Sequence, residues 1–121
     1  FGGLAVFVAS SIASLEPALL GCLMIVLDFH RPAAELRARL IAKLLPTKVT
    51  ISRDVCVEEL AKKIDGFTGG SILNGIIRAT ERAALRIGTP REITMADLVQ
   101  SFADEERLLS LHHPSHFSMF Q

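Results

Sequence analysis

The sequence predicts a mainly α-helical protein, in which a four-helix bundle follows two strands left from a parallel α/β core. Apolar residues recur at helical spacing after Pro32, and two short continuous apolar runs precede it. Half of the 121 residues are hydrophobic, which is enough for one buried core. The pattern changes at residues 30–32, so we expect a core remnant at 1–31 and a helical domain at 32–107.

The first part contains two candidate strands, residues 4–9 and 24–29. Both are continuous apolar runs of the kind found in parallel strands that are covered on both faces. Residues 14–20, between them, predict a helical turn. We expect Ser14 to cap this turn and Pro17 to occupy its start.

A membrane span is the alternative interpretation of residues 4–27, because a span needs about 20 apolar residues. Glu16 would then lie near the bilayer centre at a cost of about 2.5–3.5 kcal/mol. Pro17 and three preceding serines also interrupt the run. We therefore favour strands and expect no membrane partner, with a membrane-anchored helical domain as the weaker hypothesis.

The first two helices follow Pro32. Leu36, Leu40, Ile41, Leu44 and Leu45 form the expected inner face of the first, which Pro46 ends. The charged side chains Arg37, Arg39 and Lys43 are expected on its wet side. The second helix is predicted at 57–64, with Leu60, Ala61 and Ile64 inward and Gly66 after its end.

The third helix is predicted at residues 70–87. Its expected apolar stripe consists of Ile72, Ile76, Ile77, Ala79, Ala83, Ala84 and Ile87. The fourth begins at Thr94, whose spacing to Asp97 resembles a capping box, and fades after Glu106.

Residues 108–121 have no clear period, so we expect a disordered polar tail. His112, His113 and His116 could suggest a metal cluster, but no acidic or cysteine partner lies nearby, and we predict no metal site. Phe117 and Phe120 are expected to be loosely packed or free.

The two cysteines and the charge balance narrow the functional classes. Cys22 and Cys56 follow no metal spacing and are expected to be reduced, as in a cytoplasmic protein, although the sequence leaves a disulfide open. Thirteen basic residues balance thirteen acidic ones, which argues against a dedicated nucleic-acid binder.

Four stretches in order resemble the C-terminal end of a AAA+ ATPase module. Residues 54–61 (DVCVEELA) and 66–72 (GFTGGSI) resemble the family's "DVDLEELA" and "GFSGADI". Residues 93–98 (ITMADL) are similar to the start of the last lid helix. Residues 15–20 (LEPALL) are similar to the "LDPALL" that precedes the arginine fingers.

The resemblance implies an ATP contact at Gly69 and Gly70. In the family, the equivalent small pair lies against the adenine base and sugar, and the first lid helix adds an apolar contact, here Leu40 with Ile41 beside it. Independently, glycines at a helix start let a ligand approach free N–H groups. The residues alone equally fit a loop end at Gly69 and a core position at Leu40.

The catalytic positions depart from the family pattern. Ser10 stands where a polar residue, usually Asn, orients the attacking water, and Gly21 and Cys22 stand where arginine fingers are expected. Arg31 comes ten positions after Gly21 and is a poor replacement. No GxxxxGK[ST] loop occurs, and the strand with the Mg²⁺-binding acidic pair is missing.

We therefore interpret the chain as a C-terminal fragment or degenerate form of an ATPase subunit. It would contribute a nucleotide-responsive lid to a homo- or hetero-oligomeric ring, with ATP as cofactor and Mg²⁺ held elsewhere in the complete protein. We expect no ATP hydrolysis by this chain alone. The alternative is a helical protein-interaction module that uses no nucleotide and exposes an apolar patch.

Overall fold

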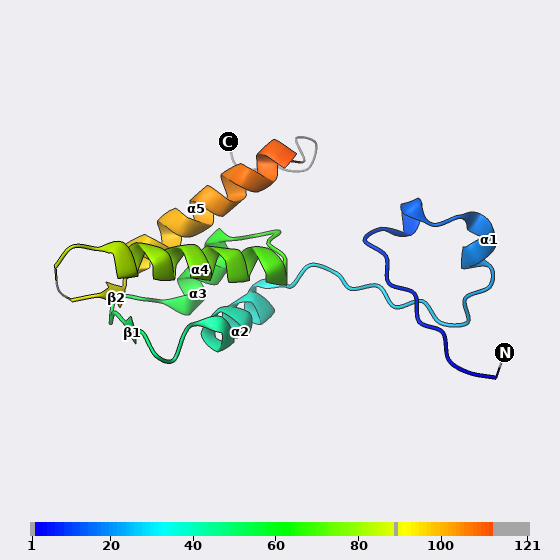
Figure 1. The fold of residues 1–121 in the computed structure, drawn as a ribbon, viewed down its shortest axis with the longest axis horizontal. Coiled ribbons are helices and arrows are strands. Elements are labelled where there is room, and N and C mark those ends of the chain that lie inside the picture. Colours follow the sequence, from blue (N-terminus) through cyan, green and yellow to red (C-terminus); the bar gives the residue numbers. More distant parts are fainter. Residues whose placement is uncertain (1, 89, 113–121) are drawn as a thin grey trace. The chain divides into compact units, whose positions relative to one another are not determined.

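The computed structural model describes residues 2–88 and 90–112. The chain divides into two units, Phe1–His30 and Arg31–Gln121 (Figure 1). Among the described residues, all buried hydrophobic side chains belong to the second unit. The hydrophobic core therefore forms within the helical part of the chain.

The first unit contains the 3₁₀ helix η1, Ile12–Ser14, and the short α-helix α1, Pro17–Leu20. Pro17 occupies the start of α1, as predicted, and its preset φ suits that position. The predicted cap was wrong, because Glu16 precedes α1 as its N-cap residue. Ser14 instead ends η1, and its hydroxyl donates to the backbone oxygen of Ser11 at 2.6 Å.

The strands predicted at 4–9 and 24–29 do not form, and both segments have irregular backbone. Their side chains are exposed, with exposed fractions of 94% for Val8 and 99% for Met24. A parallel strand requires neighbouring strands for its hydrogen bonds and covering layers for its faces. Neither segment has such neighbours, so the apolar composition does not produce a sheet here.

The predicted four helices form in the second unit, in the expected order. They are α2 (Ala34–Leu44), α3 (Val57–Lys63), α4 (Gly69–Leu85) and α5 (Met95–His112). In the part of the chain that the structure describes, no helix is long and apolar enough to cross a membrane. The chain is thus a mainly helical small domain, with α1 as a fifth α-helix.

A small parallel sheet, absent from the sequence prediction, joins β1 (Thr50–Ile51) to β2 (Glu92–Ile93). Ile51 pairs with Ile93, and the N–H of Ser52 donates to the oxygen of Ile93 at 2.9 Å. Ile93 is fully buried. The sheet therefore ties the segment before α3 to the segment before α5.

Helix α4 lies at the centre of the core and packs against both α2 and α5. Gly75 of α4 lies so close to Phe102 of α5 that a Cβ atom would stand 2.5 Å from the ring. The ring of Phe102 meets that of Phe67 edge-on, with centroids 5.7 Å apart. The buried hydrophobic residues are Ile41, Leu60, Ala61, Ile64, Phe67, Ile72, Ile76, Ala79, Ala83, Ile93, Leu98 and Phe102.

Two helix faces differ from the sequence prediction, one on α2 and one on α4. Arg37, expected on the wet side of α2, is buried, whereas Leu36 is 47% exposed. On α4, Ile77 is 47% exposed, and Ile87 beyond the end of the helix is fully exposed. The inner face of α4 is a stripe through Ile72, Ile76, Ala79 and Ala83.

The start of α5 confirms the capping box. The N–H of Thr94 donates to Asp97 Oδ2 at 2.9 Å, and the N–H of Asp97 donates to Thr94 Oγ1 at 3.2 Å. The end of α5 differs from the prediction, because the helix continues past Glu106 to His112. Residues 108–112 are thus helical, and the rest of the predicted tail lies outside the described residues.

Candidate functional site

The start of α4 presents two exposed glycines. Thr68 caps the helix, and its Oγ1 accepts from the N–H of Ser71 at 3.2 Å. Around the position of a Cβ on Gly69 there is nothing within 4 Å, and around that on Gly70 only Thr68 Oγ1, at 3.8 Å. Packing therefore does not require glycine at either position, and the space above the helix start is open to a ligand.

The two residues expected to touch the base lie on α2, which packs against α4. Leu40 is half-buried and lies against the core. Ile41 has an exposed fraction of 0%, so its side chain is part of the core and offers no surface to a ligand. No atom of Leu40 lies within 4 Å of a Cβ position on Gly69 or Gly70.

Arg37 organises the connection that leads into this helix start. Its Nε donates to the oxygen of Ala61 at 2.9 Å, and its Nη1 donates to the oxygen of Pro32 at 2.9 Å and to Asp65 Oδ1 at 3.0 Å. Gly66, next to Asp65, has a φ of +77°, a left-handed conformation that suits glycine. Arg37 thus fixes the end of α3 and the turn before Gly69.

The sequence analysis missed Arg37, although a signal existed. Positions 37, 41 and 44 follow the spacing of one helix face. A charged residue on that face indicates a buried polar anchor whose long side chain reaches backbone oxygens.

The positions that depart from the catalytic pattern all lie in the first unit. Ser10 and Cys22 are exposed, and Gly21 follows α1 as its C-cap residue. Arg31 lies in the second unit, with its Nη1 3.6 Å from the Cβ position of Gly66.

Within residues 2–88 and 90–112, no group of three or more His, Cys, Asp or Glu residues could hold a metal ion. His112 lies at the end of α5, and its Nδ1 is 2.9 Å from the oxygen of Leu108. His113 and His116 lie outside the described residues.

A charged cluster fixes the start of α5. Arg86 Nη2 donates to both carboxylate oxygens of Asp97 at 2.6 Å, and Asp54 accepts from the N–H of Met95 at 3.3 Å. Burial alone would raise the pKa of Asp97, but hydrogen bonds from Thr94 and Arg86 lower it below its usual 3.8. These contacts stabilise the start of α5.

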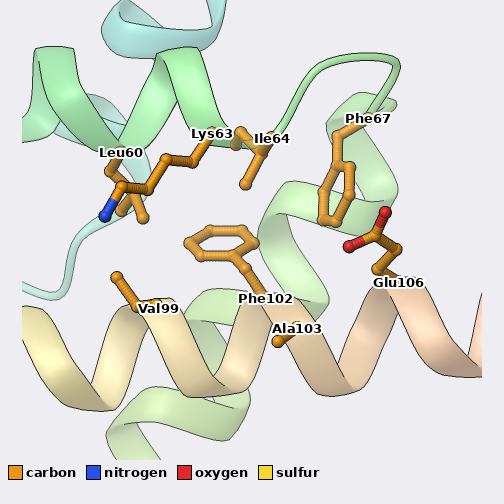
Figure 2. A pocket seen from close by; sticks show the side chains of 8 residues that line it. All are labelled: Leu60, Lys63, Ile64, Phe67, Val99, Phe102, Ala103 and Glu106. Carbon is orange, nitrogen blue, oxygen red and sulfur yellow. The ribbon is translucent and has the colours of Figure 1, made fainter. Parts of the chain in front are cut away.

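A groove lies between α3 and α5 (Figure 2). It has a volume of about 120 Å³. Its floor consists of Leu60, Ile64, Phe67 and Phe102, with Val99, Ala103, Lys63 and Glu106 around them. None of the residues expected to contact ATP lines it, so this groove is separate from the glycine site.

Comparison with known proteins gives no protein-family model that matches this chain and no match among curated proteins. The resemblance to AAA+ lids is accordingly an expectation from the four ordered sequence motifs.

Proposed function

We propose that residues 31–112 form the nucleotide-responsive lid of a AAA+ ATPase and contribute the adenine-side contacts of its ATP site. The open glycine pair at the start of α4 carries the proposal, because only the Thr68 hydroxyl lies within 4 Å of either Cβ position and a base can approach that backbone. Leu40, half-buried on α2, would add the apolar contact. The order of the four helices and of the four motifs supports the same assignment.

In this proposal the chain supplies movement and base recognition but no hydrolysis. The phosphate-binding loop, the Mg²⁺ ligands and the arginine fingers are not among its 121 residues. They would belong to other parts of the complete protein and to neighbouring subunits of a cytoplasmic ring. Opening and closing of the lid would couple the nucleotide state to those neighbours.

Nucleotide titration followed by amide NMR tests the site directly. We expect ATP to shift the amide signals of Gly69 and Gly70 most strongly, and AMP to do so as well, because the base carries the contact. Gly70→Arg should weaken this binding roughly tenfold, since its side chain fills the approach to the helix start. Ala84→Arg, at an exposed position of the same helix, is the matched control.

If saturating ATP left the amide NMR signals of Gly69 and Gly70 unchanged in the natural protein, the proposal would be contradicted. Equal binding by Gly70→Arg and Ala84→Arg would contradict it as well. Loss of binding in both variants would point to general damage of α4, which circular dichroism would reveal.

The alternative function is a protein-interaction module that uses no nucleotide. Leu73 and Ile77 favour it, because they lie one turn apart on α4 and are 41% and 47% exposed. Under this hypothesis the double variant Leu73→Lys/Ile77→Lys no longer captures a protein partner. ATP would then shift no amide signal in the double variant or in the natural protein.

A further inference from the structure

The outward face of α4 carries exposed aliphatic side chains. Leu73, Ile77 and Leu85 are 41%, 47% and 81% exposed, and they lie on the side of the helix opposite its buried stripe. Exposed apolar side chains that share one face mark a surface at which another protein surface binds. This outward face is therefore a candidate interface, and the side chains around Ile77 indicate what fits it.

An open hollow lies on this face around Ile77. It has a volume of about 290 Å³ and is lined by Asn74, Ile77, Arg78 and Glu81. These residues stand at positions i, i+3, i+4 and i+7 of one helix, the set between which a side chain of a facing helix packs in knobs-into-holes contacts. The hollow therefore suits a helix that presents an aliphatic side chain, as α4 itself does with Ile77.

Two opposite charges, Arg78 and Glu81, border the hollow. Arg78 donates from Nε to Glu105 Oε2 at 3.3 Å, but its side chain is still 41% exposed, and a guanidinium has further N–H donors. Glu81 is exposed, and no ion pair among the described residues includes it. A second α4 in antiparallel orientation brings its Glu81 to Arg78 and its Arg78 to Glu81, whereas a parallel copy would oppose like charges. The charges thus favour an antiparallel second copy.

We propose that two copies of this chain pair through α4, in antiparallel orientation, about a two-fold axis between Ile77 and Arg78. In such an isologous interface each Ile77 enters the hollow of the other copy. Glu81 of one copy then lies about one helical turn, roughly 6 Å along the helix, from Arg78 of the other, within reach of the long guanidinium side chain. The aliphatic contact supplies most of the affinity, and the ion pairs fix the orientation, because exposed ion pairs contribute little to affinity.

Disulfide trapping in the full chain tests the pair. One helix pair is smaller than a standard interface of about 1,600 Å², so we expect a weak dimer, which trapping detects. In a background of Cys22→Ser and Cys56→Ser, Ile77→Cys keeps a small apolar side chain and places two thiols beside the axis, at bonding distance for closely packed helices. We expect the linked dimer to form roughly tenfold faster than with Ala42→Cys, the matched control at an exposed position of α2.

Charge variants distinguish this pair from chance collisions of the exposed first unit. Adding Glu81→Lys to Ile77→Cys should slow trapping roughly tenfold at low salt, because it places a second cation opposite Arg78 of the other copy. Salt at about 0.5 M should restore most of the rate by screening this repulsion. Glu81→Gln, which removes the charge without reversing it, should slow trapping less. Glu81 is exposed, so circular dichroism should show unchanged helicity in both variants.

Equal trapping rates for Ile77→Cys and Ala42→Cys would overturn the proposal, as would trapping that Glu81→Lys does not slow. Slowing by Glu81→Lys that salt does not relieve would overturn it too, because repulsion across the axis is electrostatic. The buffer contains no nucleotide, so the outcome does not depend on the proposed ATP contact at Gly69 and Gly70.

Discussion

Arg37 is a charged residue that belongs to the core of the helical unit. Its side chain is 6% exposed, whereas that of its ionic partner Asp65 is 69% exposed. An ion pair with so exposed a carboxylate contributes roughly 0–1 kcal/mol. The backbone oxygens of Ala61 and Pro32 therefore account for most of what Arg37 stabilises.

Replacing Arg37 should separate these two contributions. We expect Arg37→Met to lower the free energy of unfolding by about 1–3 kcal/mol, because it leaves the buried oxygen of Ala61 without its donor. Asp65→Asn should lower it by roughly 0–1 kcal/mol. Urea denaturation followed by circular dichroism measures both.

Arg39→Met is the control for Arg37, because Arg39 is exposed on the same helix. A loss for Asp65→Asn as large as that for Arg37→Met would show that the ion pair dominates. An Arg37→Met variant as stable as Arg39→Met would show that the buried hydrogen bonds contribute nothing.

Asp97 links stability to pH. Its side chain is 12% exposed and accepts hydrogen bonds from Thr94 and Arg86. Because its pKa in the folded state lies below 3.8, its stabilising effect is complete above about pH 4 and is lost as pH falls through the folded pKa. Asp104, beside Arg82 and Gln100, is shifted in the same direction.

Asp97→Asn isolates this contribution. We expect it to lower the free energy of unfolding at pH 7 by roughly 1.5–3 kcal/mol, the range for hydrogen bonds to a charged group. The difference from the natural protein should shrink below pH 4. Urea midpoints at pH 7 and pH 3 check this, and a difference that stays constant with pH would contradict the assignment.

At the scale of elements, the contact between α4 and α5 depends on the small size of Gly75. A methyl group there would stand 2.5 Å from two ring atoms of Phe102, which is itself 2% exposed and has little room to move. Glycine inside a helix costs about 1 kcal/mol relative to alanine. The close approach of the two helices offsets that cost.

Gly75→Ala should therefore be destabilising despite its better helix propensity. We expect a loss of about 1–2 kcal/mol, since overpacking typically costs 1–3 kcal/mol. Gly70→Ala, with only Thr68 Oγ1 within 4 Å, should be neutral or stabilising. Thermal unfolding checks both, and a Gly75→Ala variant more stable than the natural protein would contradict this view of the interface.

The ends of the helices show which helix boundaries can be predicted from the sequence. Thr94 and Asp97 predict the start of α5, and Gly66 predicts the end of α3, because caps act within a few residues. The continuation of α5 to His112 was not predictable from the periodicity, which weakens after Glu106. Once a helix exists, each further residue adds one hydrogen bond, so the helix can continue where the apolar periodicity has weakened.

At the scale of the whole molecule, the two units differ in what stabilises them. In the part of the chain that the structure describes, the buried hydrophobic residues all lie in the second unit, whereas Val8, Met24 and Phe29 in the first are more than 90% exposed. Large exposed apolar surface marks places where other protein surface can bind. The first unit thus has the composition of buried strands without the sheet that would bury them.

Residues 31–121 should therefore fold without the first unit. We expect this shorter chain to unfold cooperatively at the same urea concentration as the full chain, because no core residue is removed. It should also self-associate less, as light scattering would show. A shift of the unfolding midpoint to lower urea would mean that residues 1–30 stabilise the helical unit.

The sequence by itself determined the helical unit, because helices depend on neighbours a few residues apart. Pro32, Pro46, Gly66 and the Thr94–Asp97 pair, together with the apolar spacing, are sufficient for four helices in order. The glycine pair at 69–70 was also placed correctly at a helix start.

Tertiary structure alone decided the features that depend on distant partners. Ile51 meets Ile93 in a sheet of two-residue strands, too short for any periodic signal. Arg37 is buried because Ala61 and Pro32 present their oxygens to it. The runs at 4–9 and 24–29 remained without strands, because a strand's hydrogen bonds must come from another segment.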